Sequence, residues 1–468
     1  MGFQIGDEMA GIQLGDARLN ARAVAVLEGL AADAQASVNG SFHTWKETHA
    51  AYRFFQNAKV TPEKILEPHR RATCQRIAEQ PVVLLVQDTT ELDLTDHPPE
   101  GAGPMTSEDR LGFQDHSHLA FTPDRLCLGV VAANVYARSG EGFGDSKQRQ
   151  HNPIETKETY RWLEGYRLAC EIQAASPQTQ IVSIADCEAD IYELFVEAHQ
   201  HETPADFVIR VGKNRSLPEL NPDAEGQTYR KLRDEIQAAP VVAIRDVELP
   251  YTPKREARTA RLEIRAQRIT LKAPYRKHAK LPNVEVNVVR VTEVDPPDDG
   301  TAVDWLLATS LPIDTLDEVL TVVDFYAARW PIEIFFRVLK TGCRVEEIQL
   351  ETADRFLPCL MMYKIVAWRI LYLTHMGRAS PELPCDVIFE DHEWKPVWRI
   401  VRDEPLPDSP PRLDDFLTMV AQLGGYNDRK TDRPPGPQSL WIGFRRMHDF
   451  AIAWRAFAPD SEKRNGCV

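Results

Sequence analysis

Apolar residues recur at close to helical spacing over about the first seventy residues of the chain. Leu19, Ala23 and Leu30 follow Asp16, and aspartate is a preferred N-cap, so a helix is expected to begin there. The same spacing passes through residues 50–55, and the proline at position 62 is typical of a further helix start. The pattern therefore predicts a helical N-terminal region.

Two short, mainly apolar runs come later, at residues 81–86 and 180–184. Runs of this length without alternation are typical of strands buried on both faces. We expect the first strand to end at residues 87–90, which include Asp88, and the second to end in Asp186. Because helical patterns alternate with such runs, the chain predicts an α/β sheet.

Apolar and polar residues alternate from about residue 206 to 310, as in residues 261–265, which predicts a half-exposed antiparallel sheet. Helical spacing resumes after residue 314 and continues past residue 373. The tract 381–411 is rich in proline and acids and predicts a linker or surface loops. A last helical region is expected at 413–457.

Composition adds limits on the class of protein. The 468 residues suggest two to four domains, and 55 Lys and Arg against 70 Asp and Glu give a formal charge of −15. We find no apolar stretch near the roughly 20 residues of a membrane helix and no signal peptide, so we expect no membrane partner. The eight cysteines are scattered without a CxxC pair, which indicates reduced thiols in a cytosolic chain.

One segment departs from the acidic average. Residues 254–290 hold eleven Lys or Arg against three Glu. A solvated, charged hairpin explains this stretch by itself, and a phosphate-binding surface is the alternative.

Asp88 and Asp186 are candidates for chemistry because active sites gather at the carboxyl ends of strands in α/β sheets. Two carboxylates on neighbouring strands can share Mg²⁺, which prefers oxygen ligands. An aspartate at a strand end is more often a turn former or a helix cap, so this pair alone is weak evidence.

A second constellation lies in residues 324–340. On one continuous helix, Tyr326, Arg329, Glu333 and Lys340 would fall within roughly 60° of one another. One carboxylate among cations and a phenol suits phosphodiester chemistry, whereas a salt-bridged surface helix is the simpler alternative. Pro331 is expected to kink or restart the helix between Arg329 and Glu333.

The spacing Y-x2-R-x3-E-x6-K resembles the YREK signature of bacterial insertion-sequence transposases of the DDE, hairpin-forming kind. Nine blocks agree in the right order over nearly the whole chain: LGDAR (14–18), AYRFFQN (51–57), QDTT (87–90), DCEADIYELF (186–195), FVIR (207–210), RITLK (268–272), WLLATS (305–310), LGGYNDRK (423–430) and LWIGFRRM (440–447).

The resemblance implies that Asp88, Asp186 and Glu333 form the DDE triad and hold two Mg²⁺ ions, with Mn²⁺ as a substitute. It implies contacts with DNA for a larger set, in which tyrosine and basic side chains grip the backbone and tryptophans stack on bases. That set is Tyr326, Arg329, Lys340, Trp305, Trp330, Arg210, Arg18 and Arg22. Core packing is the competing explanation for both tryptophans.

The fold implied is α/β, with a ribonuclease-H-like catalytic core and an antiparallel β insertion, flanked by helical domains. The expected domains are residues 1–70 for binding the transposon end, 71–375 for catalysis with the insertion at about 210–310, and 376–468 for dimerisation. In this setting, phosphate contact becomes the favoured explanation of the basic segment.

The activity implied is cut-and-paste transposition: nicking, hairpin formation and resolution, and joining of 3′ ends to target DNA. The partners implied are inverted-repeat end DNA, target DNA and a second copy in the synaptic complex, in a bacterial cytoplasm, with the nucleoid when DNA is bound. The alternatives are an inactive or repurposed DNA-binding relative, a nuclease without end joining and, more distantly, a glycosidase.

Three positions or properties depart from the family pattern. Cys187 replaces an arginine beside the triad, Leu19 replaces an arginine that contacts DNA, and the charge of −15 is low for a DNA enzyme. These differences concern which end is bound and how tightly, since all three triad carboxylates are present.

Overall fold

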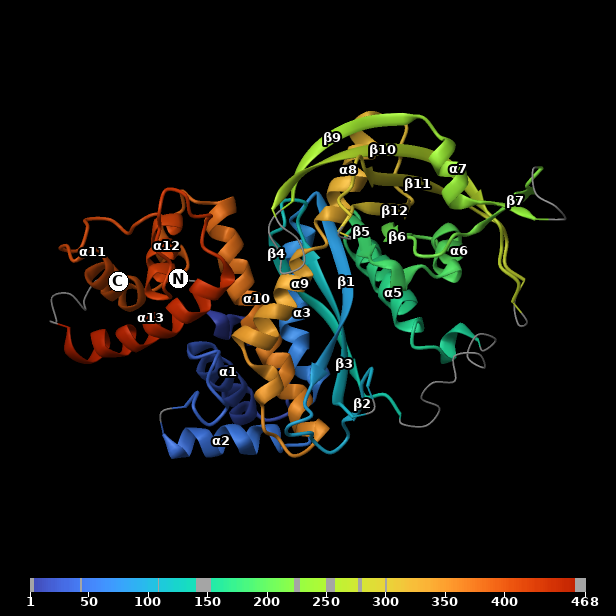
Figure 1. Ribbon diagram of the computed structural model, residues 1–468. Helices are drawn as coiled ribbons and strands as arrows, with labels where there is room; N and C mark the ends of the chain where they lie inside the picture. The colour runs from blue at the N-terminus through green and yellow to red at the C-terminus, as the bar shows by residue number, and fades with distance from the viewer. Residues whose placement is uncertain are drawn as a thin grey trace. The chain divides into compact units, whose positions relative to one another are not determined.

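The computed structural model describes residues 4–42, 44–107, 109–139, 153–222, 228–249, 257–276, 280–298 and 301–458 (Figure 1). The chain forms two compact units that are interleaved in sequence. Unit 1 comprises residues 1–76, 89–141 and 331–468, and unit 2 comprises residues 77–88 and 142–330. Both units contain helices and strands, so the α/β class expected from the sequence is confirmed.

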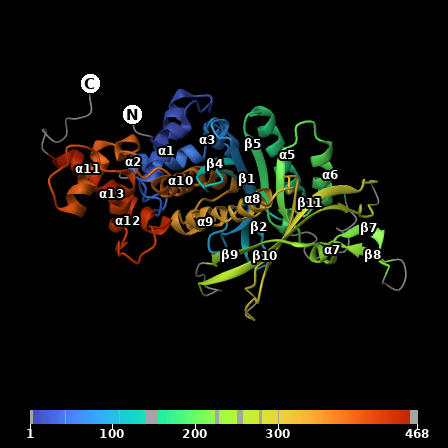
Figure 2. The ribbon, with the colours of Figure 1, turned by 90° about the horizontal axis from the view of Figure 1, so that it is seen from above.

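Unit 2 is built on a mixed sheet with the strand order β1-β5-β6-β12-β11-β10-β9. Strands β1, β5 and β6 are parallel, and the remaining neighbours pair antiparallel. The antiparallel strands β9 to β11 form a curved ribbon (Figures 1 and 2). The strands are β1 (Val82–Asp93), β5 (Gln180–Ala185), β6 (Asp206–Arg210), β9 (Val241–Leu249), β10 (Arg258–Leu271), β11 (Val284–Glu293) and β12 (Asp304–Thr309), with β7 (Ser216–Leu220) and β8 (Tyr229–Lys231) as a separate pair.

Helices cover both faces of this sheet. The register pairs Arg210 with Leu307 and Ser183 with Phe207, which fixes the face to which each side chain points. Phe207 packs against aromatic rings of α5 and α6, so these helices lie on one face. Helix α8 lies on the other face, where its Tyr326 meets Trp305. The helices of unit 2 are α5 (Tyr160–Ala175), α6 (Tyr192–Gln200), α7 (Leu232–Ala238) and α8 (Leu316–Ala327), with short turns at η2 (Ile154–Thr156) and η3 (Cys187–Ala189).

Unit 1 packs helices around a smaller antiparallel group of strands. Strand β3 pairs with β2 and β4, and the last residues of β1 belong to this unit. Its strands are β2 (Gly103–Pro104), β3 (Leu111–Phe121) and β4 (Cys127–Tyr136). Its helical elements are η1 (Ile5–Met9), α1 (Ala17–Ala32), α2 (Trp45–Phe55), α3 (Pro62–Ala78), α9 (Pro331–Arg337), η4 (Val338–Gly342), η5 (Val345–Glu347), α10 (Ala353–Ala379), η6 (Cys385–Val387), α11 (Asp391–Arg402), α12 (Leu413–Leu423) and α13 (Pro437–Phe457).

Helix α10 is the central helix of unit 1. Among the described residues it is the one helix that is long and apolar enough to cross a membrane by length and composition, which the sequence analysis did not expect. However, 83% of its apolar window is buried inside the protein. Because core helices pass the same test, we interpret α10 as a core helix.

Several elements match the sequence predictions. Asp16 caps α1, accepting hydrogen bonds from the backbone N–H groups of Arg18 and Leu19, and Ala23 and Leu30 are buried as expected. The strand expected at 180–184 is β5. The seven cysteines within the described residues are all free.

Other predictions are wrong in instructive ways. Strand β1 does not end at residues 87–90 but continues to Asp93, because its second half belongs to unit 1. The tract 381–411 contains helix α11, whose Trp394 is buried, rather than loops alone. The restart expected at Pro331 is confirmed, because α8 ends at Ala327 and α9 begins at Pro331, so the estimate of one shared face on a continuous helix does not apply.

Candidate active site

Asp88 and Asp186 occupy equivalent positions on neighbouring parallel strands. The paired register of β1 and β5 ends with Val86 opposite Ile184, and each aspartate comes two residues later. Side chains two residues apart point to the same face of a sheet, so both carboxylates point to the α8 face, at the carboxyl edge of the paired strands. Asp186 also caps the η3 turn, accepting a hydrogen bond of 2.8 Å from the backbone N–H of Glu188.

Arg329 lies directly against Asp88. Helix α8 ends at Ala327, and a tight turn, in which the Arg329 N–H donates to the Tyr326 carbonyl, carries the side chain back toward the sheet. The Arg329 Nη1 atom is 2.5 Å from Asp88 Oδ2, and both side chains are about 15% exposed. The guanidinium therefore balances the charge of the carboxylate within unit 2.

Tyr326, Trp305 and Arg210 form a second group on the same face. The Tyr326 and Trp305 rings meet edge to face with centroids 5.1 Å apart. Burial raises the pKa of Tyr326, while Arg329, Arg210 and a hydrogen bond with Arg210 act in the opposite direction. Tyr326 is buried, and its neighbours on this face are Trp305 and Arg210.

Trp330 differs from Trp305 in exposure. The Trp330 side chain is 53% exposed, so core packing does not account for it. Trp305 is half-buried at the start of β12 and keeps part of its ring accessible. Both side chains therefore have surface with which a base could stack.

Glu333 and Lys340 belong to unit 1. Glu333 lies in the first turn of α9, where the helix dipole favours a carboxylate. Lys340 lies on a single π-helical turn, an irregularity that is frequent at functional sites, and its Nζ is 3.2 Å from Glu346 Oε1. The structure thus brings together Asp88, Asp186, Arg210, Trp305, Tyr326 and Arg329 in unit 2, and places Glu333 and Lys340 in unit 1.

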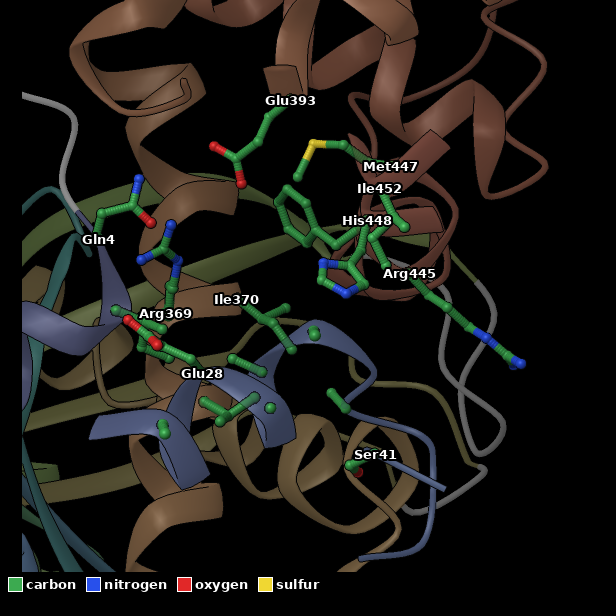
Figure 3. Close-up of a pocket in the computed structure, with 18 of the residues that line it drawn as sticks. Gln4, Glu28, Ser41, Arg369, Ile370, Glu393, Arg445, Met447, His448 and Ile452 are labelled. Atoms are coloured by element: carbon green, nitrogen blue, oxygen red, sulfur yellow. The ribbon is translucent and has the colours of Figure 1, made fainter. Parts of the chain in front are cut away.

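Arg18 and Arg22 also belong to unit 1 and are exposed on α1, four residues apart. Arg22 in addition lines a cavity of about 720 Å³ among α1, α10, α11 and α13. Figure 3 shows this cavity, with Glu28, Arg369 and His448 among its labelled lining residues. None of the proposed catalytic carboxylates lines it.

Many basic side chains of the segment 254–290 are already paired with acids, which its composition does not reveal. Lys254, Arg255 and Lys277 lie outside the described residues. Many of the others pair with acids of the same unit, and the longest of these pairs, Arg268 with Glu285, measures 3.9 Å. The paired arginines are Arg258, Arg265, Arg268, Arg276 and Arg290. This pairing argues for a mixed surface rather than a uniformly positive one.

Sequence reasoning missed one acid beside this site. Asp304, the residue before Trp305, forms ion pairs with arginines of two other elements. Arg233 Nη1 is 3.3 Å from its Oδ2 atom, and Arg290 Nε is 3.6 Å from its Oδ1 atom. Arg210 also donates a hydrogen bond to the Asp304 carbonyl. Since these partners are up to 94 residues away, no local signal in the sequence could have identified them.

The donor set of the strand ends fits a hard cation. Asp88 and Asp186 offer carboxylate oxygens on one face, and Asp88 already requires a positive partner, which Arg329 supplies here. Across the described parts of the chain, no group of three His, Cys, Asp or Glu side chains is close enough to hold a metal ion.

Three family models match the chain in order. Residues 5–60 match "Transposase DNA-binding", residues 163–368 match "Transposase DDE domain" and residues 365–462 match "Transposase Tn5 dimerisation domain". The first two define the class, a DNA transposase with a DDE domain. The third shows that the chain is similar to transposases of the Tn5 type. DDE transposases depend on divalent metal.

The chain is also similar to a solved structure of the piggyBac transposase, in a synaptic complex with hairpin DNA. The identity is 9%, the TM-score is 0.36, and the match covers 95% of this chain and 73% of that chain. A likeness of this size carries no argument about mechanism.

Proposed function

We propose that the protein is a cut-and-paste DNA transposase with the YREK signature, which binds transposon ends, nicks them, forms and resolves a hairpin, and joins the 3′ ends to target DNA. The observation that most supports this proposal is the pair Asp88 and Asp186 on one face of adjacent strands, with Arg329 against Asp88. Arg210 and Trp305 lie on the same face, and the transposase matches give this arrangement its chemical context.

In this proposal Asp88, Asp186 and Glu333 hold two Mg²⁺ ions, for which Mn²⁺ can substitute. Bound Mg²⁺ supplies Lewis-acid stabilisation to a phosphodiester that undergoes in-line displacement. Water first attacks the phosphorus at the transposon end, and the 3′ oxygen leaves as a hydroxyl. That hydroxyl then attacks the phosphorus of the opposite strand and displaces the 3′ oxygen of the flanking DNA, which leaves as a hydroxyl. This step closes the hairpin without a covalent intermediate between protein and DNA.

The cationic side chains hold the DNA backbone. Arg329 and Lys340, each paired with a carboxylate here, exchange that carboxylate for a phosphate oxygen of the end, and Arg210 holds the backbone nearby. Tyr326 completes this group through its phenol. Trp305 and Trp330 offer stacking surfaces for an unpaired base, and such stacking contributes about 1–3 kcal/mol per base.

The proposal also assigns the chain its domains and partners. Residues 1–70, with Arg18 and Arg22, bind the end, residues 71–375 catalyse on a ribonuclease-H-like core, and residues 376–468 pair two copies in the synaptic complex. We place the protein in the bacterial cytoplasm, on the nucleoid when it is bound to DNA.

The test compares the wild type with Glu333→Ala on a labelled duplex that carries the inverted repeat, with Mg²⁺. We expect the wild type to give a nick and then a hairpin on a denaturing gel. Glu333→Ala should bind the duplex and cut about a thousandfold more slowly, because the metal site contributes several kcal/mol. Glu347→Ala is the matched control, since Glu347 is an exposed acid that pairs with Arg344.

The products of the wild type distinguish the proposed transposase from two alternatives. A wild type that binds the end and never cuts, in Mg²⁺ or Mn²⁺, would replace this proposal with an inactive, DNA-binding relative. A nick without any hairpin would leave a nuclease on the same fold.

A further inference from the structure

Asp190 is a buried acid four residues after Asp186, and the proposed reaction gives it no role. Its side chain is 1% exposed, so it reaches neither solvent nor DNA. A buried carboxylate is costly unless its oxygens accept hydrogen bonds. Its partners therefore show what this acid is for.

All of these partners come from the loop that follows β6. Asp190 Oδ2 accepts hydrogen bonds from the backbone N–H groups of Gly212 (3.1 Å) and Lys213 (2.9 Å). Asp190 Oδ1 accepts from Arg215 Nε at 2.8 Å, and the Asp190 carbonyl accepts from Arg215 Nη2 at 2.9 Å. The guanidinium of Arg215 lies over the Tyr192 and Phe195 rings, which fixes its direction.

The opposite end of this short segment holds Asp186. The η3 turn separates the two aspartates, and the backbone N–H of Asp190 donates to the Cys187 carbonyl within it. The two loops also touch, because a side chain at Gly212 would come within 3.2 Å of the Cys187 Cβ atom. Asp190 therefore joins the loop after β5, which begins with Asp186, to the loop after β6, which follows Arg210.

We propose that Asp190 is a positioning residue that sets the place of Asp186 relative to Arg210, so that the metal ligand and the arginine meet one phosphate together. This inference rests on the proposed function. Residues that orient metal ligands without touching the metal affect metal affinity or activity by about 10- to 100-fold when they are changed. Asp190 acts in this way through backbone and arginine rather than through the ion.

The test uses Asp190→Asn in the full-length protein. An amide in place of the carboxylate turns one acceptor into a donor that faces N–H groups, so the two loops separate locally. We expect Mn²⁺ binding to the DNA-free protein, measured by calorimetry, to weaken about tenfold and end cutting to slow up to 100-fold. Affinity for the end duplex should fall less than Mn²⁺ affinity, since Arg210 is one contact among several and Arg18 and Arg22 lie in unit 1.

Asp206→Asn is the matched control. Asp206 begins β6, at the end of the strand opposite to Arg210. It likewise links neighbouring elements, because its carboxylate accepts hydrogen bonds from Gln180 Nε2 and Ser310 Oγ at 2.8 Å each. We expect this variant to bind Mn²⁺ and to cut as the wild type does. A merely structural role for Asp190 would make the two variants alike.

A second variant covers a failure of Asp190→Asn to fold. Arg215→Lys keeps the charge and removes the forked contact with Asp190, so a smaller loss of Mn²⁺ affinity is expected in the same direction. Mn²⁺ binding by both variants at the level of Asp206→Asn would overturn the proposal. A wild type that binds Mn²⁺ and never cuts would overturn the proposed function alone, because the comparison of Mn²⁺ affinities would still decide the role of Asp190.

Discussion

The two units hold their charged pairs in different ways. At the strand ends of unit 2, Asp88 and Arg329 form an ion pair in which both side chains are about 15% exposed. In the interior of unit 1, Lys364 of α10 pairs with Asp115 of β3, and both side chains are fully buried. Lys364 also donates a hydrogen bond of 2.7 Å to Ser117 Oγ.

This difference separates charges that can change partner from charges that cannot. A partly exposed guanidinium can release a carboxylate when a phosphate takes its place, because water and the new partner compensate both groups. In a fully buried ion pair, neither water nor a new partner can replace the lost group, and breaking the pair leaves an uncompensated charge in the core. The pair in unit 2 is therefore suited to binding, and the pair in unit 1 fixes the position of α10 on β3.

The largest effect is expected for Lys364→Met. Removing one partner of a sealed ion pair costs about 3–5 kcal/mol, so the free energy of unfolding should fall by that amount in a urea titration followed by circular dichroism. Arg355→Met, at the start of the same helix, removes a pair with Glu351, which precedes the helix and is 80% exposed, and should cost less than about 1 kcal/mol.

The double variant Lys364→Met with Asp115→Leu sharpens this result. Replacing both charges by apolar groups should restore most of the lost stability, because no unpaired charge remains. A double variant as unstable as the single one would show that the pair is not the cause.

A smaller effect is expected for Arg329→Gln. Without the guanidinium, Arg329 no longer competes with a cation for the Asp88 carboxylate, so the DNA-free protein should bind Mn²⁺ about tenfold more tightly, or about 1.4 kcal/mol. Calorimetry measures this change directly. Arg245→Gln, which removes an exposed pair with Asp324 in the same unit, should leave the affinity unchanged. Equal Mn²⁺ affinities in all three proteins would refute the exchange of partners at Asp88.

The smallest effect concerns pH and unit 1. Burial lowers the pKa of His118 from 6.5 to about 4, and it also lowers the pKa of the buried His69. Because the unfolded chain binds these protons more readily, stability is complete above pH 6.5 and falls as the pH drops toward 4. His118 alone should reduce the free energy of unfolding by about 1 kcal/mol between pH 7 and pH 5.5. Urea titrations at both pH values test this, and His118→Gln should flatten the difference.

The sequence predicted best what depends on local pattern. The cap at Asp16, the buried strand that leads to Asp186 and the restart at Pro331 follow from residue types within a few positions of one another. It missed β3, because residues 114–118 are polar and yet buried, so the strand shows neither alternation nor a continuous apolar run. Partners such as Lys364 lie about 250 positions away, so no window along the chain contains them.

By itself, the sequence determined which residues carry charge and chemistry, because side-chain identity is fixed by position. It identifies Asp88, Asp186, Glu333, Arg329 and Lys340. The tertiary structure decided which of these charges already have a partner. Arg329 lies against Asp88 and Asp190 holds the loop after β6 because the register of parallel strands sets which strand ends become neighbours. That register results from packing the two faces of the sheet, a condition on residues far apart in the chain, and so it cannot be obtained from local spacing.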